Sequence, residues 1–241
     1  MEEMFDDMRG ENQTVDVKIA GFGRLAETVL ERVLRDTIPN AETNSETPHT
    51  DRANLVIVAV GTDDEKELNA ACDFIRTAKA KNALLFSVVF PGNGPVNRIK
   101  SEADVVFAAP SEEAFTEALS VLYRYMALFL ENECVVGVDI SDLKAMFTDA
   151  GEAFLGVGFD ACALDVAFAA KDAMAKPIAG SFLQKFRSVL VGIAGNETLE
   201  ILEFRKAIDV ISATADEDAG ILWCFSAGPN TDAVRVIVVA A

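Results

Sequence analysis

Histidine, paired cysteines and long apolar runs are scarce in this chain, and each shortage excludes a class of function. The one histidine, His49, lies in a polar stretch, so neither a histidine-based catalytic triad nor a zinc site is expected. The four cysteines form no C-x-x-C pair and have apolar neighbours, which indicates free thiols in a reducing cytoplasm. No apolar run reaches the ~20 residues of a membrane-spanning helix, and no signal peptide is recognisable. We therefore expect a cytoplasmic protein without a metal site.

Positive charge is also scarce. The 241 residues include 21 Lys and Arg against 39 Asp and Glu, a formal net charge of −18. Such a surface repels phosphate backbones and anionic lipid headgroups, so we expect neither nucleic-acid binding nor direct membrane binding. Hydrophobic residues make up 51% of the chain, enough for an ordered protein with a substantial core.

What the chain does have is a strongly apolar helical pattern over residues 111–132. The spacing alternates between four and three residues, at Phe115, Leu119, Leu122, Met126 and Phe129. This spacing predicts an α-helix. Further apolar residues cover the opposite side, so the helix is expected to be buried nearly all round, with Ser111 as its N-cap.

An acidic loop follows this helix. Residues 134–142 read C-V-V-G-V-D-I-S-D, and residues 153–158 read A-F-L-G-V-G. The stretch resembles the FtsZ family of tubulin-like cell-division GTPases, in which a central helix leads into an N-x-D-x-x-D catalytic loop, a helix and an A-x-x-G-x-G strand. Gly137 stands where that family has asparagine. The resemblance makes Asp139 and Asp142 the candidate catalytic residues, because their counterparts polarise water on the GTP held by the next subunit.

The same acidic residues also fit a purely structural interpretation. Asp139 ends a predicted strand, and Ser141 or Asp142 is well suited to begin a helix. Both interpretations of the loop stay open at this point.

The resemblance continues to the C-terminus and implies an FtsZ/tubulin-like α/β fold, and we divide the chain into four parts. The first is residues 1–14, which are acidic and without periodicity and are for that reason expected to form a disordered tail. The resemblance implies the other three: a reduced nucleotide-binding-type domain with a Rossmann-like parallel sheet (15–110), the central helix (111–132) and a C-terminal α+β domain (133–241). Within the tail, Met4, Phe5 and Met8 are an alternative: a short docking motif in an otherwise polar segment.

A first glycine-bearing turn lies between the first predicted strand and helix. Residues 21–26 read G-F-G-R-L-A, and G-x-G-x-x-A is typical of dinucleotide-binding folds. Those folds need a second strand that carries an acidic residue, and residues 38–53 contain no apolar run that would form one. Dinucleotide binding is therefore the less favoured hypothesis. In the FtsZ family the corresponding turn, here Gly21 and Gly23, lets backbone N–H groups approach phosphate.

A second turn, at Gly61, follows the predicted strand 54–60. The FtsZ family has G-G-G-T-G-T-G here, a loop that binds the GTP phosphates at a helix N-terminus. This chain reads G-T-D-D-E-K-E over residues 61–67, with Thr62 or Asp63 as the expected N-cap. Carboxylates in this loop repel a triphosphate. A magnesium-binding cluster is the alternative, but helix capping is the better supported interpretation.

The guanine-binding position has changed as well. In the family an aromatic residue and an Asp or Asn four residues later hold the base. Phe115 fits the aromatic residue, but Leu119 occupies the polar position and accepts no hydrogen bond from guanine. We therefore expect Gly21, Gly23, Gly61 and Phe115 to be degenerate nucleotide-binding positions, and no cofactor to be bound.

The sequence thus predicts an FtsZ-like cytoskeletal protein of the cell-division type. We expect it to lack GTP binding and to associate through its acidic loop with itself or with a complete FtsZ. The alternative is a divergent GTPase whose remodelled pocket still binds GTP.

Overall fold

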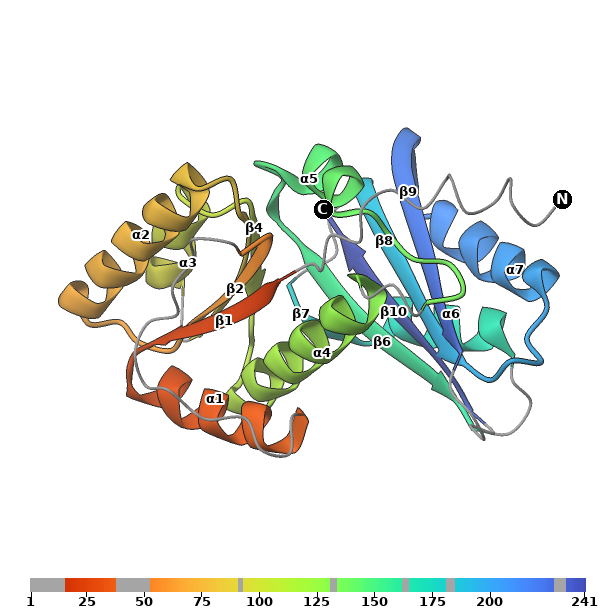
Figure 1. Ribbon diagram of the computed structural model, residues 1–241, viewed down its shortest axis with the longest axis horizontal. Coiled ribbons are helices and arrows are strands. Elements are labelled where there is room, and N and C mark those ends of the chain that lie inside the picture. Colours follow the sequence, from red (N-terminus) through yellow and green to blue (C-terminus); the bar gives the residue numbers. More distant parts are fainter. Residues whose placement is uncertain are drawn as a thin grey trace, which may run out of the picture.

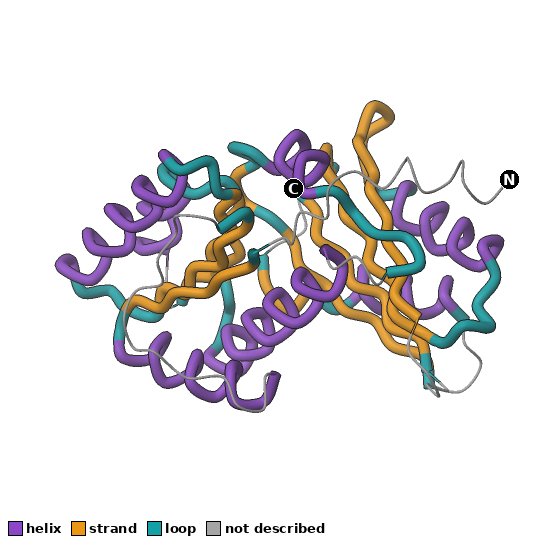
Figure 2. The backbone as a smooth tube through the Cα atoms, in the orientation of Figure 1, coloured by secondary structure: helices purple, strands orange, loops and turns teal. Residues whose placement is uncertain are grey.

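The computed structural model describes residues 16–37, 53–90, 93–130, 134–161, 165–180, 185–227 and 233–241. The tail predicted over residues 1–14 and the histidine at position 49 lie outside these residues. Two sheets lie on either side of one long helix, with further helices outside them (Figures 1 and 2). In chain order the elements are β1 (Val17–Phe22), α1 (Arg24–Thr37), β2 (Leu55–Val60), α2 (Glu65–Ala80), β3 (Leu84–Val89), α3 (Asn93–Lys100), β4 (Val105–Ala108), α4 (Glu112–Leu130), α5 (Ile140–Phe147), β5 (Gly151–Glu152), β6 (Phe154–Asp160), α6 (Val166–Ala175), β7 (Pro177–Ala179), β8 (Phe186–Gly195), α7 (Ile201–Ser212), β9 (Ala215–Ala227) and β10 (Val234–Ala240).

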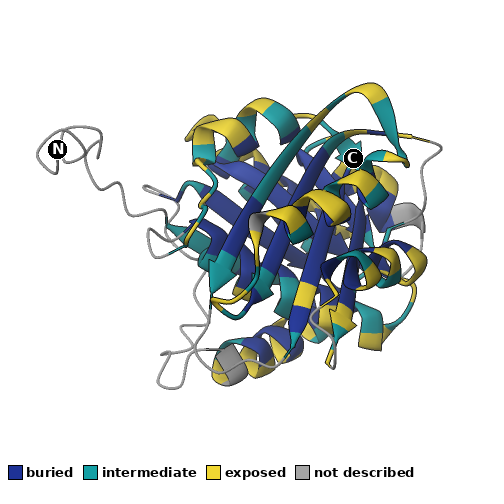
Figure 3. Cartoon of the chain, turned by 90° about the vertical axis from the view of Figure 1, so that its right-hand side faces the viewer, coloured by how far each residue is buried: buried dark blue, intermediate teal, exposed yellow. Residues whose placement is uncertain are grey.

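The first sheet has the strand order β1-β2-β3-β4-β5, and all its pairings are parallel. Every residue of β2 and β3 is buried, as expected for central strands of a parallel sheet covered on both faces. The helices α2 and α3 cover one face of the sheet, and α1 and α4 cover the other. Figure 3 shows the buried strands between exposed helical surfaces.

The helix predicted around Phe115 is present as α4. Its N-terminus is capped by Ser111, whose Oγ accepts a hydrogen bond from the Ala114 N–H at 3.2 Å. The residues of the four-and-three pattern are all buried, and α4 shares one hydrophobic core with α1, the first sheet and the second sheet. This confirms the predicted central helix between the two halves.

The second sheet has the order β7-β6-β10-β8-β9 and is mainly antiparallel, with β8 and β9 parallel. One face packs on α4, and α6 and α7 cover the other. A Cβ built on Gly156 or Gly158 of β6 would lie 2.2 Å from the Ala173 carbonyl oxygen or 1.7 Å from that of Ala169. The two glycines of A-F-L-G-V-G therefore allow α6 to pack directly on the strand backbone.

Two features depart from the sequence interpretation. Residues 91–95 read P-G-N-G-P, a sequence that predicts a tight turn. In the structure α3 begins at Asn93 and has Pro95 in its first turn, where proline is tolerated. The segment after α5 also contributes to both sheets: β5 pairs with β4, and β6 then enters the second sheet. Among the described helices, none is both long and apolar enough to cross a membrane.

Candidate functional site

The two glycine-bearing turns that the sequence resemblance predicts as degenerate nucleotide-binding positions pack directly against each other. Gly23 has a φ of +92°, and a Cβ built on it would lie 2.6 Å from the Thr62 Cβ. A Cβ on Gly61 would lie 2.7 Å from the Ala26 nitrogen, and one on Gly21 would lie 2.6 Å from a Leu30 methyl carbon. These glycines therefore allow the β1–α1 turn, the β2–α2 loop and α1 to pack in close contact.

The N-terminus of α2 is occupied by a side chain of its own loop. One carboxylate oxygen of Asp64, Oδ1, accepts hydrogen bonds from the backbone N–H groups of Lys66 (2.9 Å) and Glu67 (3.2 Å). The Thr62 hydroxyl in turn accepts a hydrogen bond from the Asp64 N–H at 3.0 Å. The predicted N-cap at Thr62 or Asp63 is thus wrong by one or two residues, because Thr62 closes a short turn and leaves the cap to Asp64.

The surroundings of this helix N-terminus are acidic and exposed. Asp63, Asp64 and Glu65 are all exposed, and Glu65 has a salt bridge to Arg98 of α3 at 3.0 Å. Within the described ranges, no three Asp, Glu, Cys or His side chains are grouped as ligands for a metal ion.

Phe115 and Leu119, at the predicted base-binding position, are core residues. Both side chains are fully buried, and the Phe115 ring lies 6.3 Å from the Phe90 ring, centroid to centroid. Neither side chain presents a polar group toward the ends of the strands.

The acidic loop lies beyond the other end of α4. Asp139 is the N-cap of α5, and its Oδ1 accepts hydrogen bonds from the Ser141 N–H and the Ser141 hydroxyl, both at 2.6 Å. The Ser141 hydroxyl and then the Ser141 N–H lower the pKa of the Asp139 carboxyl. Asp142, in the first turn of α5, is exposed, as are Asp139 and Gly137. The loop thus presents two carboxylates to solvent while one of them caps a helix.

Backbone hydrogen bonds hold the loop in place from both sides. Val136 and Phe225 of β9 exchange two hydrogen bonds, at 3.2 and 2.8 Å, and the Val138 N–H donates to the Phe129 carbonyl of α4 at 3.3 Å. At the far end of α5, the Met146 carbonyl accepts a hydrogen bond from the Ser188 hydroxyl of β8 at 2.6 Å. The acidic residues are therefore carried on a short helix fixed to the second sheet.

A buried carboxylate that the sequence analysis missed ties the same helix to the first sheet. The Asp104 side chain is buried and accepts hydrogen bonds from the N–H groups of Leu85 (2.9 Å) and Asp149 (3.2 Å). Lys79 of α2 lies 2.8 Å from Asp104 and 2.6 Å from Asp149. Burial opposes the charge on Lys79, but its hydrogen bonds to Asp104 and Asp149 outweigh burial and raise its pKa. Only the acidic residue itself was visible in the sequence, because its partners are far from it along the chain.

The structure does not bring the two groups of predicted site residues together. Gly23 and Gly61 follow the carboxyl ends of β1 and β2 and Phe115 lies in the first turn of α4, whereas Asp139 and Asp142 come after the C-terminal end of α4. With 19 residues, α4 is about 28 Å long. The chain therefore has two separate candidate sites, at opposite ends of its central helix.

The hydrogen bonds of Asp139 give a testable titration. We expect Ser141→Ala to raise the pKa of Asp139 toward its ordinary value, because the hydroxyl that favours the carboxylate is lost. A lowered folded-state pKa means that the cap's contribution to stability is present above the unfolded pKa and is lost as the pH falls through the folded value. NMR titration of the Asp139 carboxyl carbon measures the shift. Ser141→Thr keeps the hydroxyl and should keep the low pKa, and equal pKa values in wild type and Ser141→Ala would contradict the assignment.

Comparisons with known proteins agree with this architecture. The model of the FtsZ family, C-terminal domain, matches residues 151–241. A structure of an M. jannaschii FtsZ W319Y mutant superposes with a TM-score of 0.78 at 16% identity, covering 100% of this chain and 94% of the other. An empty FtsZ dimer from M. jannaschii gives a TM-score of 0.76 at 15% identity, with 99% and 91% covered. CetZ2 from Haloferax volcanii, described as a GTPγS-bound protofilament, gives 0.72 at 14% identity, with 94% and 92% covered. These findings confirm the predicted FtsZ/tubulin-like fold.

Proposed function

We propose that this FtsZ/tubulin-like chain is a cytoskeletal subunit of the cell-division type that binds no GTP itself and associates with other subunits through its acidic loop. The observation that carries the proposal is the cap of α2. There the Asp64 carboxylate takes the first-turn N–H groups that a phosphate would need. We expect no cofactor, and a cytoplasmic protein.

The charge around that cap supports the same conclusion. A triphosphate placed at the α2 N-terminus would face Asp63, Asp64 and Glu65. Two like unit charges 4 Å apart cost about 1 kcal/mol in water and about 4 kcal/mol at the dielectric typical of a protein surface. With several such pairs, the total repulsion energy exceeds the stabilisation that a few hydrogen bonds to phosphate provide.

The packing of the other nucleotide positions adds to this. The turns that contain Gly23 and Gly61 pack against each other, and the side chains of Phe115 and Leu119 are buried in the core. Opening a place for a guanine base would require core residues to move. A remodelled pocket that still binds GTP is the competing hypothesis, and it is an outcome of the experiment below.

The acidic loop supports the second part of the proposal. Asp139 and Asp142 are exposed and fixed on α5, so they are positioned to face a second molecule. The similar structures are described as an FtsZ dimer and a CetZ2 protofilament, which makes self-association or association with a complete FtsZ the partner class that we propose. Any catalysis would then act on a neighbour's GTP, with Asp139 and Asp142 as the residues involved.

The nucleotide part is tested by calorimetry. We expect no heat of binding when the protein is titrated with GTP or GDP and magnesium, because the phosphate and base positions are both filled. A complete FtsZ in the same buffer is the positive control, and a micromolar Kd for this chain would establish the divergent GTPase instead. Asp64→Ser keeps a capping oxygen while it removes the charge, so it shows whether the carboxylate alone blocks phosphate.

A further inference from the structure

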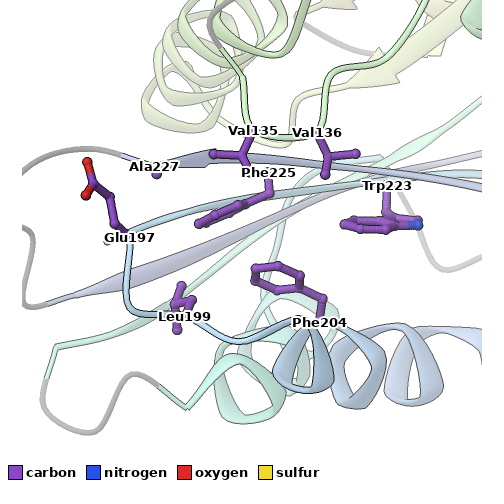
Figure 4. A pocket seen from close by; sticks show the side chains of 8 residues that line it. All are labelled: Val135, Val136, Glu197, Leu199, Phe204, Trp223, Phe225 and Ala227. Carbon is purple, nitrogen blue, oxygen red and sulfur yellow. The ribbon is translucent and has the colours of Figure 1, made fainter. Parts of the chain in front are cut away.

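A pocket of about 240 Å³ lies where the loop before α5, β9 and the start of α7 meet (Figure 4). The Phe204 ring lies 4.7 Å from Phe225 and 5.8 Å from Trp223, centroid to centroid. The apolar part of the lining is formed by Val135, Val136, Leu199, Phe204, Trp223 and Phe225. Its size is that of one or two large side chains.

The pocket is held open by fixed backbone. Val136 and Phe225 are joined by two hydrogen bonds, so the loop forms one wall at a set distance from β9. The neighbouring Val135 is 65% exposed, the highest exposure among the large hydrophobic residues of the described chain. An apolar cavity beside an exposed valine is a surface that an apolar side chain would fill.

This chain contains a segment whose chemistry suits that surface. Apart from Gly10, residues 1–15 are acidic or polar except for Met1, Met4, Phe5, Met8 and Val15. Met4, Phe5 and Met8 fall within five consecutive residues, so the large apolar side chains of the segment are close together in the sequence. Arg9 is the only basic side chain of the segment, and Glu197 is the only charged residue lining the pocket.

The segment also starts within reach of the pocket. Asp16 directly precedes Val17 of β1, and Val17 and Tyr123 of α4 pack against the same hydrophobic core. Burial and then the Asp16 charge raise the pKa of Tyr123, in keeping with this placement. From Tyr123 to Phe129 is about 9 Å along the helix. The Phe129 carbonyl accepts a hydrogen bond from the Val138 N–H, and Val138 is two residues from Val136 in the pocket wall. Together these steps make a path on the order of 25 Å from Asp16 to Val136 in the pocket wall. The eleven residues from Phe5 to Asp16 span up to about 36–40 Å when extended, so the segment is long enough.

A second copy offers less to fill the pocket. The exposed large hydrophobic residues of the described chain are Val135, Phe159, Phe168 and Leu202, all in its second half. Of its described large apolar side chains, a second copy would have only these to present, and it would present them without a tether. A tethered segment needs only weak contacts, because the tether supplies an effective concentration on the order of millimolar.

We propose that residues 4–9 bind intramolecularly in this pocket, with Phe5 packed against Trp223 and Phe204, Met8 beside it, and Arg9 toward Glu197. The pocket adjoins the acidic loop, since Val135 and Val136 precede Asp139 by three or four residues. The bound segment therefore adds a further wall against which that loop is held. The docking involves no nucleotide and does not depend on the function proposed above.

Trp223 is the only tryptophan of the chain, so its fluorescence reports the state of the pocket directly. We expect deletion of residues 2–14, or Phe5→Ala with Met8→Ala, to move Trp223 emission to longer wavelength and to raise its quenching by acrylamide, because water reaches the ring. Asn12→Ala, in the same segment, is the matched control and should change neither. A synthetic peptide of residues 1–15 added to the shortened protein should restore the original emission, and the Phe5→Ala peptide should not.

A change on the pocket side completes the test. Val135→Asp adds a charge at an exposed position of the wall and should reproduce the effect of the deletion, whereas Phe168→Asp, at another exposed apolar residue, should not. Far-UV circular dichroism checks that each variant is folded. Equal emission and quenching in wild type and Phe5→Ala/Met8→Ala would overturn the proposal. A signal that disappears on dilution would place a second copy's segment in the pocket and overturn the intramolecular binding.

Discussion

Added at a few per cent of a polymerising FtsZ from the same organism, the protein is expected to shorten the filaments and lower the light-scattering plateau. Our proposal gives it an acidic loop that meets a neighbour but no nucleotide with which to receive the next subunit. Head-to-tail filaments grow only while each new subunit offers both ends. With one such molecule for every few tens of FtsZ subunits, the mean filament length is limited to a few tens of subunits. Light scattering and phosphate release measure the effect.

Charge and helix capping at the acidic loop can be separated in this assay. Asp139→Ser with Asp142→Asn removes both charges while a serine still caps α5, so we expect the effect on filaments to be lost and the fold to be kept. Glu31→Ala with Asp209→Ala removes the same charge from exposed positions on α1 and α7 and serves as the matched control. An unchanged effect after the loop substitutions, or no effect of the wild type, would rule out association through this loop.

Phosphate release distinguishes two forms of the same association. Gly137 stands at the asparagine position of the N-x-D-x-x-D pattern, so under the proposed function it offers no side chain to the neighbour's nucleotide. We therefore expect the phosphate released per polymerised subunit to rise little, even where filaments shorten. Shortening needs only the contact made by α5, whereas hydrolysis needs the water to be positioned as well.

The sequence predicted the elements whose signal is local. The four-and-three spacing around Phe115 identified α4, and the strand predicted over residues 54–60 is present as β2. In α3 the local signal misled: Gly94 and Pro95 are typical turn residues, yet proline also fits the first turn of a helix, and tertiary packing decided between the two.

Features formed by residues far apart in the chain could not be predicted from the sequence. Asp104 accepts a hydrogen bond from the Asp149 N–H and forms a salt bridge with Lys79, and no periodicity in the sequence connects these three positions. The pocket around Trp223 likewise combines three separate stretches of the chain. The acidic loop is an intermediate case: the motif located Asp139, but its hydrogen bonds to Ser141 became visible only in the structure.

The largest expected effect on stability is at Gly158 of β6. Gly158→Ala would place a methyl group 1.7 Å from the Ala169 carbonyl oxygen, which is backbone and can only move if α6 leaves the sheet. Overpacking of a core usually costs about 1–3 kcal/mol, and a clash with backbone belongs at or above the upper end. In a chain of this size, about 3 kcal/mol lowers Tm by roughly 6–12 °C. Thermal unfolding followed by circular dichroism measures the change.

Gly220→Ala in β9 is the matched control for this prediction. The nearest atom to its new Cβ would be the terminal methyl carbon of Met146, at 3.2 Å. That methyl group ends a flexible side chain and turns aside at little cost, so we expect Gly220→Ala to change Tm by no more than a few degrees. Equal losses of Tm in the two variants would mean that α6 moves off β6 as easily as one methionine rotates. The close packing that we assign to the A-F-L-G-V-G strand would then not be what requires its glycines.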